Sequence, residues 1–244
     1  MPDKGADFDN ELYALRTVEG QSLNELRRGH ERALRWYGSF LRPWLPDDRA
    51  SRMLDVPCGA GNLLHALRGL GYTRVTGVDS DARQVELAKQ LGLPATLGDA
   101  FAAIEACSFE SVVRIFSLDF LEHLDPQRAV EFVRLAHRAL VPGGILLCRT
   151  PSADGPFGSH DRHNDLTHRW AMTSNSSVTF MRMAGFSADG VSVRQEAPVP
   201  YKVSNLARLA LFRATTSLAG WFLDAAGIGA PRIWTRSMWI VAKK

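Results

Sequence analysis

The sequence predicts an α/β protein whose mostly parallel sheet is covered by helices on both faces. Short apolar runs alternate with amphipathic helical segments between residues 52 and 150, which is the pattern of βαβ units. A glycine-containing turn, "PCGAG", joins the first apolar run to the first helical segment. Glycines in that turn let the backbone approach a ligand at the carboxyl edge of the sheet.

Five apolar runs are expected to form strands, and three amphipathic segments between them are expected to form helices. The expected strands are 52–56, 74–79, 95–97, 112–117 and 144–150. The expected helices are 62–70, 82–91 and 126–140. Arg114 interrupts the fourth run, so we expect a strand position close to solvent or a shifted strand boundary there.

The pattern changes on both sides of this region. Apolar residues at helical spacing from residue 20 stop at Pro43 and predict that residues 1–48 form a helical N-terminal extension. Residues 49–244 are expected to form one domain, since the length and the 45% hydrophobic content suit a single core. After residue 150 we expect a substrate-side loop insertion, a helix, a strand, a helical insertion and a final strand. Their ranges are 151–172, 175–184, 190–195, 201–228 and 232–244.

Composition excludes several classes of protein. The net charge is only +3 and the basic residues are scattered, which argues against nucleic-acid binding. The three cysteines are far apart, which fits a reducing compartment and argues against a disulfide framework or a zinc site. The sequence contains no secretory signal and no run of about 18 uncharged apolar residues. We therefore expect a cytoplasmic protein that does not span a membrane.

Three successive predicted strands each bring a carboxylate to the carboxyl edge of the sheet, at Asp55, Asp79 and Asp99. The carboxyl ends of parallel strands meet at one edge of the sheet, and an acid after the second strand lies where the ribose of an adenosine-type ligand would bind. Asp99 taken alone can also be a helix cap. Leu64 occupies the place of the third glycine of a dinucleotide fingerprint. A carboxylate at Asp55 would repel phosphate and favour a cationic amino group, so we expect a ligand without phosphates.

Five segments of the chain carry a resemblance to a known family. They are "LDVPCGAGNLL", "VTGVDSD", "GDAF", "LDFLEHL" and "LVPGGILLCRTP", in this order. Together they resemble the class I S-adenosylmethionine-dependent methyltransferases over residues 50–152. The resemblance implies a Rossmann-like fold with a mostly parallel, seven-stranded sheet. It also implies an enzyme that uses S-adenosyl-L-methionine.

The resemblance also implies how the cofactor would be bound. Asp79 would hold the ribose, Gly59 and Gly61 would pass under the methionine part, and Asp55 would orient the amino group of methionine. Pro57 departs from the family, because it replaces the first glycine of the usual D-x-G-x-G-x-G turn. Proline is tolerable there if the position does not need a positive φ.

Three further residues are implied to contact the cofactor. Asp99 with Ala100 would read the adenine, and Leu118 would flank the cofactor at the end of the fourth strand. These residues complete the predicted cofactor site.

The segment "HDRHNDLTH" at residues 160–168 is the predicted wall of the acceptor site. A hydroxyl acceptor must lose its proton as it attacks, so a base must lie within hydrogen-bond reach. His163 or His168 would be that base, with Asp165 orienting it. Arg162 would then bind a hydroxyl-rich or anionic acceptor.

Two other interpretations of this segment remain open. Asp161, His163 and Asp165 could gather a divalent ion that polarises two acceptor hydroxyls, or Asp165 could cap a turn while the histidines are solvated. His123, in "LDFLEHL", is another candidate base, although its apolar neighbours suggest a structural turn. We predict the base assembly of His163, Asp165 and His168, without a metal.

Within the family, the loop after residue 155 resembles enzymes of polysaccharide and other glycan biosynthesis. The matching residues are Pro156, Phe157, Gly158, Ser159, Arg162, Asp165, Thr167 and His168. The resemblance implies O-methylation of a sugar hydroxyl in a glycan or an activated sugar precursor. The alternative is a small-molecule acceptor such as a quinone or a secondary metabolite. From other classes, an NAD-type oxidoreductase or a cofactor-binding protein without catalysis is also possible.

One further segment, 205–226, has an apolar helical face flanked by basic residues. Such a face could touch a membrane surface, act as a lid or form the interface of a homodimer. The apolar face comprises Leu206, Ala210, Ala214, Leu218, Trp221 and Ala225.

Overall fold

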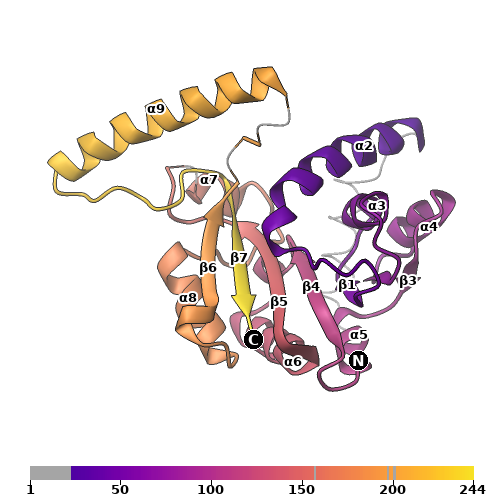
Figure 1. Ribbon diagram of the computed structural model, residues 1–244. Helices are drawn as coiled ribbons and strands as arrows, with labels where there is room; N and C mark the ends of the chain where they lie inside the picture. Colours follow the sequence, from indigo (N-terminus) through magenta and orange to yellow (C-terminus); the bar gives the residue numbers. More distant parts are fainter. Residues whose placement is uncertain (1–22, 157, 197, 200–201) are drawn as a thin grey trace.

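The protein contains a seven-stranded sheet with helices on both faces, as Figure 1 shows. This computed structural model describes residues 23–244 except 157, 197 and 200–201. The strand order is β3-β2-β1-β4-β5-β7-β6, and only β7 runs antiparallel to its neighbours. The predicted fold class is therefore confirmed. The strands are β1 (Met53–Asp55), β2 (Val75–Asp79), β3 (Ala95–Leu97), β4 (Val112–Leu118), β5 (Leu140–Pro151), β6 (Val191–Gln195) and β7 (Ser237–Lys243).

Helices enclose the sheet in two layers. On one face the packed helices are α2 (Leu23–Phe40), α3 (Asn62–Gly69) and α4 (Ala82–Gln90). On the other face they are α5 (Ala100–Glu105), α6 (Pro126–Ala139) and α8 (Ser174–Met183). The remaining helices are α7 (Gly158–His163), α9 (Val203–Ala225) and the short 3-10 turns η1 (Arg42–Trp44), η2 (Leu121–His123) and η3 (Ala188–Gly190).

Alternation along the central strands assigns side chains to these two layers. Ile115 and Leu146 belong to the core on the α5–α6–α8 side, whereas their chain neighbours Phe116 and Leu147 belong to the core on the α2–α3–α4 side. Successive side chains of a strand point to opposite faces. A sheet buried on both faces therefore has the continuous apolar runs seen in this sequence.

The structure refines several of the predicted elements. The strand expected at 144–150 is longer, since β5 begins at Leu140, and the predicted loop insertion contains the short helix α7. The predicted N-terminal extension includes α2, which packs against α3, while residues 1–22 lie outside the described residues. Arg114 is half-buried, and its guanidinium donates to the carbonyls of Val113 and Trp44. A cation inside β4 is thus tolerated because its charged end reaches polar backbone groups.

The chain after β5 returns to the edge that carries the carboxyl ends of the parallel strands. Pro151, at the end of β5, pairs with Ser237 at the start of β7, and Gln195, at the end of β6, pairs with Met238. The whole connection between β6 and β7, including α9, therefore starts and finishes at this edge, where ligands bind in open α/β sheets.

Candidate active site

A cavity of 390 Å³ opens at the carboxyl ends of β1, β2 and β4. Its size is that of a small-molecule site. Side chains from α2, the glycine turn and the ends of these strands surround it. The lining residues are Leu26, Tyr37, Asp55, Pro57, Cys58, Gly59, Ala60, Asn62, Leu63, Asp79, Ser80, Asp81, Gln84, Leu87, Leu118, Asp119, Phe120, His123, Arg149 and Thr167.

The glycine turn before α3 has the backbone conformation that its sequence suggests. Gly59 and Gly61 have φ values of +52° and +84°, which L-residues with side chains rarely adopt. A Cβ on Gly61 would also lie 2.5 Å from Leu93 Cδ1. Pro57 lines the same cavity without needing a positive φ. Proline at position 57 is therefore compatible with this turn, although the family usually has glycine there.

Asp55 supplies a test of whether these residues fit a cationic ligand. Its side chain is buried, and neither carboxylate oxygen has a hydrogen-bond partner among the described residues. Burial, and then the nearby charge of Asp79, raise the pKa of Asp55 well above its usual value. A buried carboxylate of this kind is stabilised by a cation. The amino group and the sulfonium of S-adenosylmethionine meet that need.

Asp79 is fixed by two backbone donors at the wall of the cavity. Gly59 N–H donates to Oδ2 at 2.7 Å, and Asp81 N–H donates to Oδ1 at 2.9 Å. Burial raises the pKa of Asp79, although these backbone hydrogen bonds oppose the rise. Each oxygen keeps a second lone pair, so the carboxylate can still accept from ribose hydroxyls.

The other predicted cofactor residues differ in where the structure puts them. Leu118 lines the cavity. Asp99 is exposed and caps α5, because its carboxylate accepts from Ala102 N–H at 2.9 Å, and Ala100 is buried in the core on that side. Neither Asp99 nor Ala100 belongs to the cavity lining, so their contact with adenine stays a prediction.

The helix α2 also contributes to this cavity, although nothing in the sequence pattern predicts a contact between this helix and a ligand. Leu26 and Tyr37 project from α2 into the lining. Burial raises the pKa of Tyr37 to about 12, so its hydroxyl keeps its proton. Residues at helical spacing in "LNELRRGHERALRWYGSF" indicate a packed helix, but nothing local indicates which ligand it covers.

A second cavity of 530 Å³ adjoins the first on the β5 side. The two cavities share Asp119, His123 and Arg149, so a molecule in one would meet a molecule in the other at these three side chains. Its lining is mostly charged and polar. The lining residues are Asp119, Glu122, His123, Arg149, Pro151, Asp161, Asn164, Asp165, His168, Glu196, Arg236 and Ser237.

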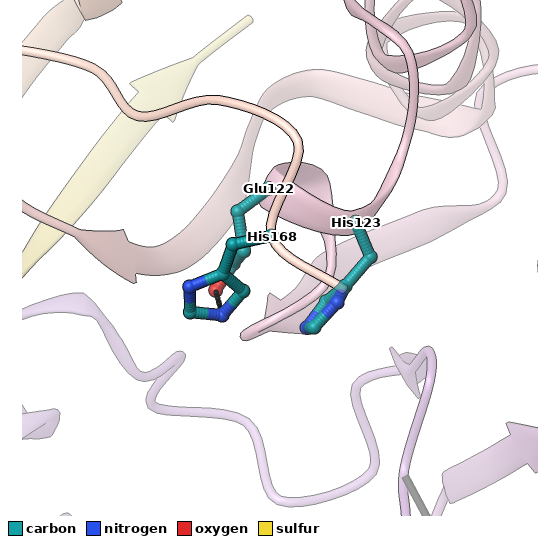
Figure 2. Close-up of side chains that lie close together, drawn as sticks. All are labelled: Glu122, His123 and His168. Atoms are coloured by element: carbon teal, nitrogen blue, oxygen red, sulfur yellow. Dashed lines mark ion pairs between the residues drawn. The ribbon is translucent and has the colours of Figure 1, made fainter. Parts of the chain in front are cut away.

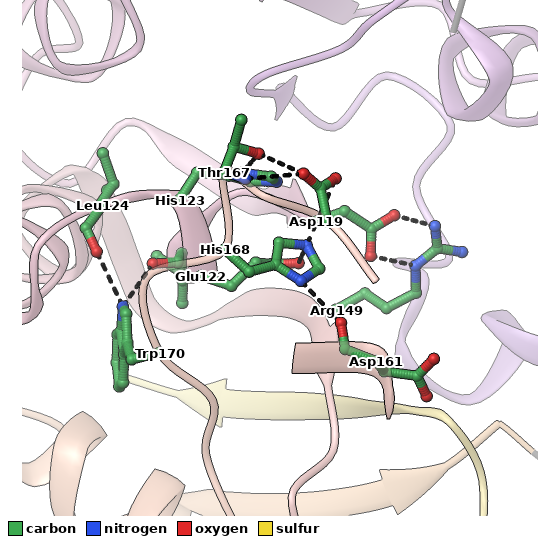
Figure 3. A network of polar contacts seen from close by, with 11 residues as sticks. Asp119, Glu122, His123, Leu124, Arg149, Asp161, Thr167, His168 and Trp170 are labelled. Carbon is green, nitrogen blue, oxygen red and sulfur yellow. Dashed lines mark hydrogen bonds and ion pairs between the residues drawn. The ribbon is translucent and has the colours of Figure 1, made fainter. Parts of the chain in front are cut away.

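A chain of hydrogen bonds orients His123 at the junction of the cavities (Figure 3). Thr167 Oγ1 donates to Asp165 Oδ1 at 2.7 Å and lies 2.8 Å from His123 Nδ1. Because the hydroxyl proton is used on the carboxylate, the hydroxyl oxygen accepts from His123 Nδ1–H. Neutral imidazole then has its lone pair on Nε2. Burial, followed by repulsion from His168, lowers the pKa of His123, which keeps the ring neutral.

His168 is oriented by a backbone carbonyl. Its Nδ1 lies 3.0 Å from the Asp161 carbonyl oxygen, which can only accept, so the proton is on Nδ1. Its Nε2 is 3.8 Å from Asp165 Oδ2 and 4.0 Å from Glu122 Oε1. Burial raises the pKa of Glu122 well above its usual value, and the charge of Asp119 adds to this rise. His168 therefore faces a buried carboxyl group inside the second cavity.

The structure separates the three predicted catalytic residues. Asp165 and His168 line the second cavity, but His163 is exposed at the end of α7 and lines neither cavity. Arg162 is also absent from the cavity linings, and its guanidinium donates to the carbonyl of Arg169. His123, the weaker candidate on sequence grounds, takes the position at the junction.

Some side chains of the site are not predicted by the sequence pattern. Arg149 Nε donates to Asp119 Oδ1 at 2.9 Å, and Asp119 has a φ of +52° just after β4. Arg149 is the single charge in the apolar strand "GILLCRTP", and this signal could have identified it. Thr167 carried a signal only through the glycan-enzyme motif. Glu122 carried none, because a glutamate in a short turn is ordinary.

The candidate metal ligands in the structure differ from Asp161, His163 and Asp165, the group that the sequence offers. Glu122, His123 and His168 are the described residues whose possible ligand atoms gather within 4.8 Å of one another, and Figure 2 shows them side by side. Asp161 is instead engaged by Arg236, whose Nε donates to Oδ1 at 2.7 Å.

Comparisons with known proteins agree with this geometry. Residues 26–189 match the family described as "Methyltransferase domain". The chain is 34% identical over 151 residues to a ubiquinone biosynthesis O-methyltransferase of Methylocella silvestris, covering 57% of this chain and 54% of that protein. It is 33% identical over 119 residues to one of Xanthomonas oryzae pv. oryzae, covering 44% and 47%. The chain thus spans about half the length of these curated relatives.

Solved structures show the same fold at low sequence identity. An S-adenosylmethionine-dependent methyltransferase from Archaeoglobus fulgidus superposes with a TM-score of 0.62 at 17% identity, covering 99% of this chain and 100% of that one. Phosphoethanolamine N-methyltransferase 2 of Haemonchus contortus, in complex with S-adenosyl-L-methionine, gives 0.61 at 16% identity, covering 97% and 60%. The predictions of a methyltransferase and of its cofactor are thus confirmed at the level of family and fold. The chain belongs to the methyltransferase-domain family and has the fold of the S-adenosylmethionine-dependent methyltransferases.

Proposed function

We propose that this chain transfers the methyl group of S-adenosylmethionine to a hydroxyl group of a small acceptor bound in the second cavity. One observation carries the proposal: His123 lines both cavities, and its Nδ1 is held by Thr167. A base at the junction of a cofactor cavity and an acceptor cavity suits the methylation of a hydroxyl, which must lose a proton.

The cofactor cavity suits a ligand that is positively charged and carries a ribose. Asp55 would face the amino group of methionine, Asp79 would accept from the ribose hydroxyls, and the turn at Gly59 would pass along the methionine part. When bound, S-adenosylmethionine supplies a methyl group on a cationic sulfur. The protein's own contribution is to align the acceptor and to exclude water.

His123 would take the proton from the acceptor hydroxyl through Nε2. Its lowered pKa keeps Nε2 unprotonated at neutral pH, and Thr167 and Asp165 fix the ring and stabilise the charge that forms. His168 would contact the acceptor from the β5 side of the cavity. Both histidines are in the tautomer that a base requires.

The first acceptor class is a hydroxylated aromatic compound, such as a quinone precursor. The names of the two curated relatives support this class, and neither name mentions a glycan. This was the alternative on sequence grounds, and the comparisons favour it over the glycan acceptor that the loop motif suggested.

A sugar hydroxyl is the second candidate acceptor, because of the chemistry of the second cavity. Its lining contains Pro151 as the single apolar side chain. Carboxylates, imidazoles and an amide offer many partners to a polyhydroxylated ligand, whereas a largely apolar ring would leave them unpaired. The two acceptor classes therefore make different demands on the same residues.

An acceptor panel tests the proposal. The purified chain is incubated with S-adenosylmethionine and either dihydroxybenzoates or nucleotide sugars, and release of S-adenosylhomocysteine is measured. We expect release above background with one class and its loss in His123→Ala. If EDTA abolishes turnover and Mg²⁺ restores it, the acceptor hydroxyl would be activated by a metal ion at Glu122, His123 and His168 rather than by a histidine base. The absence of release with both classes would contradict the proposal.

A further inference from the structure

The helix α9 lies outside the helical layers that enclose the sheet. Figure 1 shows it stretched across the end of the molecule beyond β6 and β7. Of its 23 residues, Asn205 and Gly220 are the buried ones. Asn205 Nδ2 donates to the Val199 carbonyl at 2.7 Å, and Gly220 faces Ala230 and Trp234. Both contacts are with the segments that lead into and out of the helix, and most of the helix surface is exposed.

The exposed surface of α9 includes an apolar side that runs along its length. Leu211, Leu218 and Phe222 follow at spacings of seven and four, which is one helical face. With Trp221, these side chains are 64% to 69% exposed, and Val203 is 82% exposed. An exposed apolar surface of this extent marks an interaction site.

The charge around this face is positive. Between residues 202 and 232 the chain has four basic residues and one acidic residue, Asp224. Asp224 Oδ1 accepts from Ala230 N–H at 2.7 Å. An apolar helical face with aromatic residues and basic flanks is the composition of helices that lie in the surface of an anionic membrane. The basic residues are Lys202, Arg208, Arg213 and Arg232.

A second copy of the chain is less suited to cover this face. Two copies of α9 packed face to face would bring together two basic segments, each with four basic residues and one acidic residue between residues 202 and 232. Like charges placed together in an interface oppose association. Anionic lipid headgroups instead complement Arg208 and Arg213 while the acyl region takes up the leucine and tryptophan side chains.

The segment that contains α9 joins the sheet beside the second cavity. The connection that contains α9 begins after Gln195 and ends at Ser237, both at the carboxyl edge of the sheet, and Arg236 and Ser237 line the second cavity. None of the described helices is long and apolar enough to cross a membrane. We propose that α9 docks on the surface of an anionic membrane through its exposed apolar face, with the acceptor cavity on the membrane side of the molecule.

Vesicle sedimentation tests this proposal with the full chain. Vesicles of phosphatidylcholine with phosphatidylglycerol are compared with vesicles of phosphatidylcholine alone. We expect binding to the anionic vesicles, weakened by added salt. Leu218→Glu combined with Trp221→Glu should lower the vesicle affinity at least about tenfold. The matched control, Phe109→Glu combined with Met183→Glu, changes two equally exposed apolar residues elsewhere and should bind like the unchanged protein.

Binding of S-adenosylmethionine to each variant reports whether it is folded, because no residue of α9 lines the cofactor cavity. The proposal is overturned if the unchanged chain stays in the supernatant with both kinds of vesicle, or if the control loses binding as strongly as the α9 variant. It is also overturned if the α9 variant only converts a dimer to a monomer in sedimentation, since a second copy would then be the occupant.

Discussion

The two cavities of the site are built in different ways. Most of the lining of the cofactor cavity comes from strand ends and a backbone turn within about 65 consecutive residues, from Asp55 to Leu118. The acceptor cavity depends on side-chain contacts between distant segments, such as Thr167 with His123 and Arg236 with Asp161. A binding site made by strand topology can stay constant while a loop beside it changes. The acceptor class can therefore differ between relatives that share one cofactor.

The largest expected effect falls on turnover, at the junction of the cavities. His123→Ala removes the proposed base, so kcat should fall by about 10² or more, while the affinity for S-adenosylmethionine should change little. Isothermal titration and release of S-adenosylhomocysteine measure the two quantities separately. His163→Ala is the matched control, since His163 is exposed and lines neither cavity, and should keep full turnover. An equal loss of turnover in both variants would contradict the assignment of His123 as the base.

The next effect falls on the cofactor cavity. Two backbone donors hold the Asp79 carboxylate in place, and Asp79→Ala removes this acceptor of the ribose hydroxyls. Hydrogen bonds to a charged group contribute about 1.5 to 3 kcal/mol each. We expect S-adenosylmethionine to bind about 10² times more weakly in titration. Asp99→Ala should weaken binding far less, because Asp99 caps α5 outside the cavity. Equal losses would instead support the predicted contact of Asp99 with adenine.

A smaller effect is expected from the residue that orients the base. Thr167→Val keeps the shape but removes the hydroxyl between His123 and Asp165, so kcat should fall by roughly tenfold, as for the loss of one buried hydrogen bond. In the unchanged protein, kcat should rise with pH through the lowered pKa of His123 and reach a plateau before neutrality. Thr167→Val should shift the pH range over which kcat rises, and Thr167→Ser should restore the original range. An unshifted pH profile would mean that Thr167 acts on structure alone.

The smallest effect concerns stability. The folded-state pKa of Asp55 is raised, so this group destabilises the ligand-free protein increasingly as pH rises above the unfolded pKa. Asp55→Asn should raise Tm by about 2 to 4 °C at pH 8, the shift expected for roughly 1 kcal/mol in a chain of this length, and the gain should vanish near pH 4. The same variant should bind S-adenosylmethionine more weakly. A lower Tm at pH 8 would show that the carboxylate has a stabilising partner in the ligand-free protein.

The cofactor side could be predicted from the sequence because its signals are local. Asp55 and Asp79 lie at the ends of predicted strands, Gly59 lies in the turn after the first of them, and the topology of a parallel sheet brings strand ends together. Asp99 looked equivalent in the sequence, yet it caps a helix, because a strand-end aspartate suits both roles. The choice between them depends on the direction of the side chain, which spacing does not reveal.

The acceptor side could be predicted only in part. The segment at 160–168 contributes Asp161, Asn164, Asp165 and His168 to the lining of the second cavity, but three histidines in nine positions cannot be ranked without knowing how the loop folds. The short helix α7 directs His163 to solvent, and Thr167 joins the loop to His123 across 44 positions of the chain. Contacts of this range follow from packing rather than from periodicity.

The position of β7 between β5 and β6 has a consequence for the synthesis of the chain. Among the described strands, β6 pairs with β7 alone, and β7 follows it after roughly 40 residues. At about 5 to 20 residues per second, a ribosome needs some seconds to make that stretch. During this interval both edges of β6 lack a hydrogen-bonded strand. The helix α9 also leaves the ribosome before Trp234, which faces Gly220 of this helix. A nascent chain caught at this stage would be a natural client for chaperones that cover exposed apolar segments.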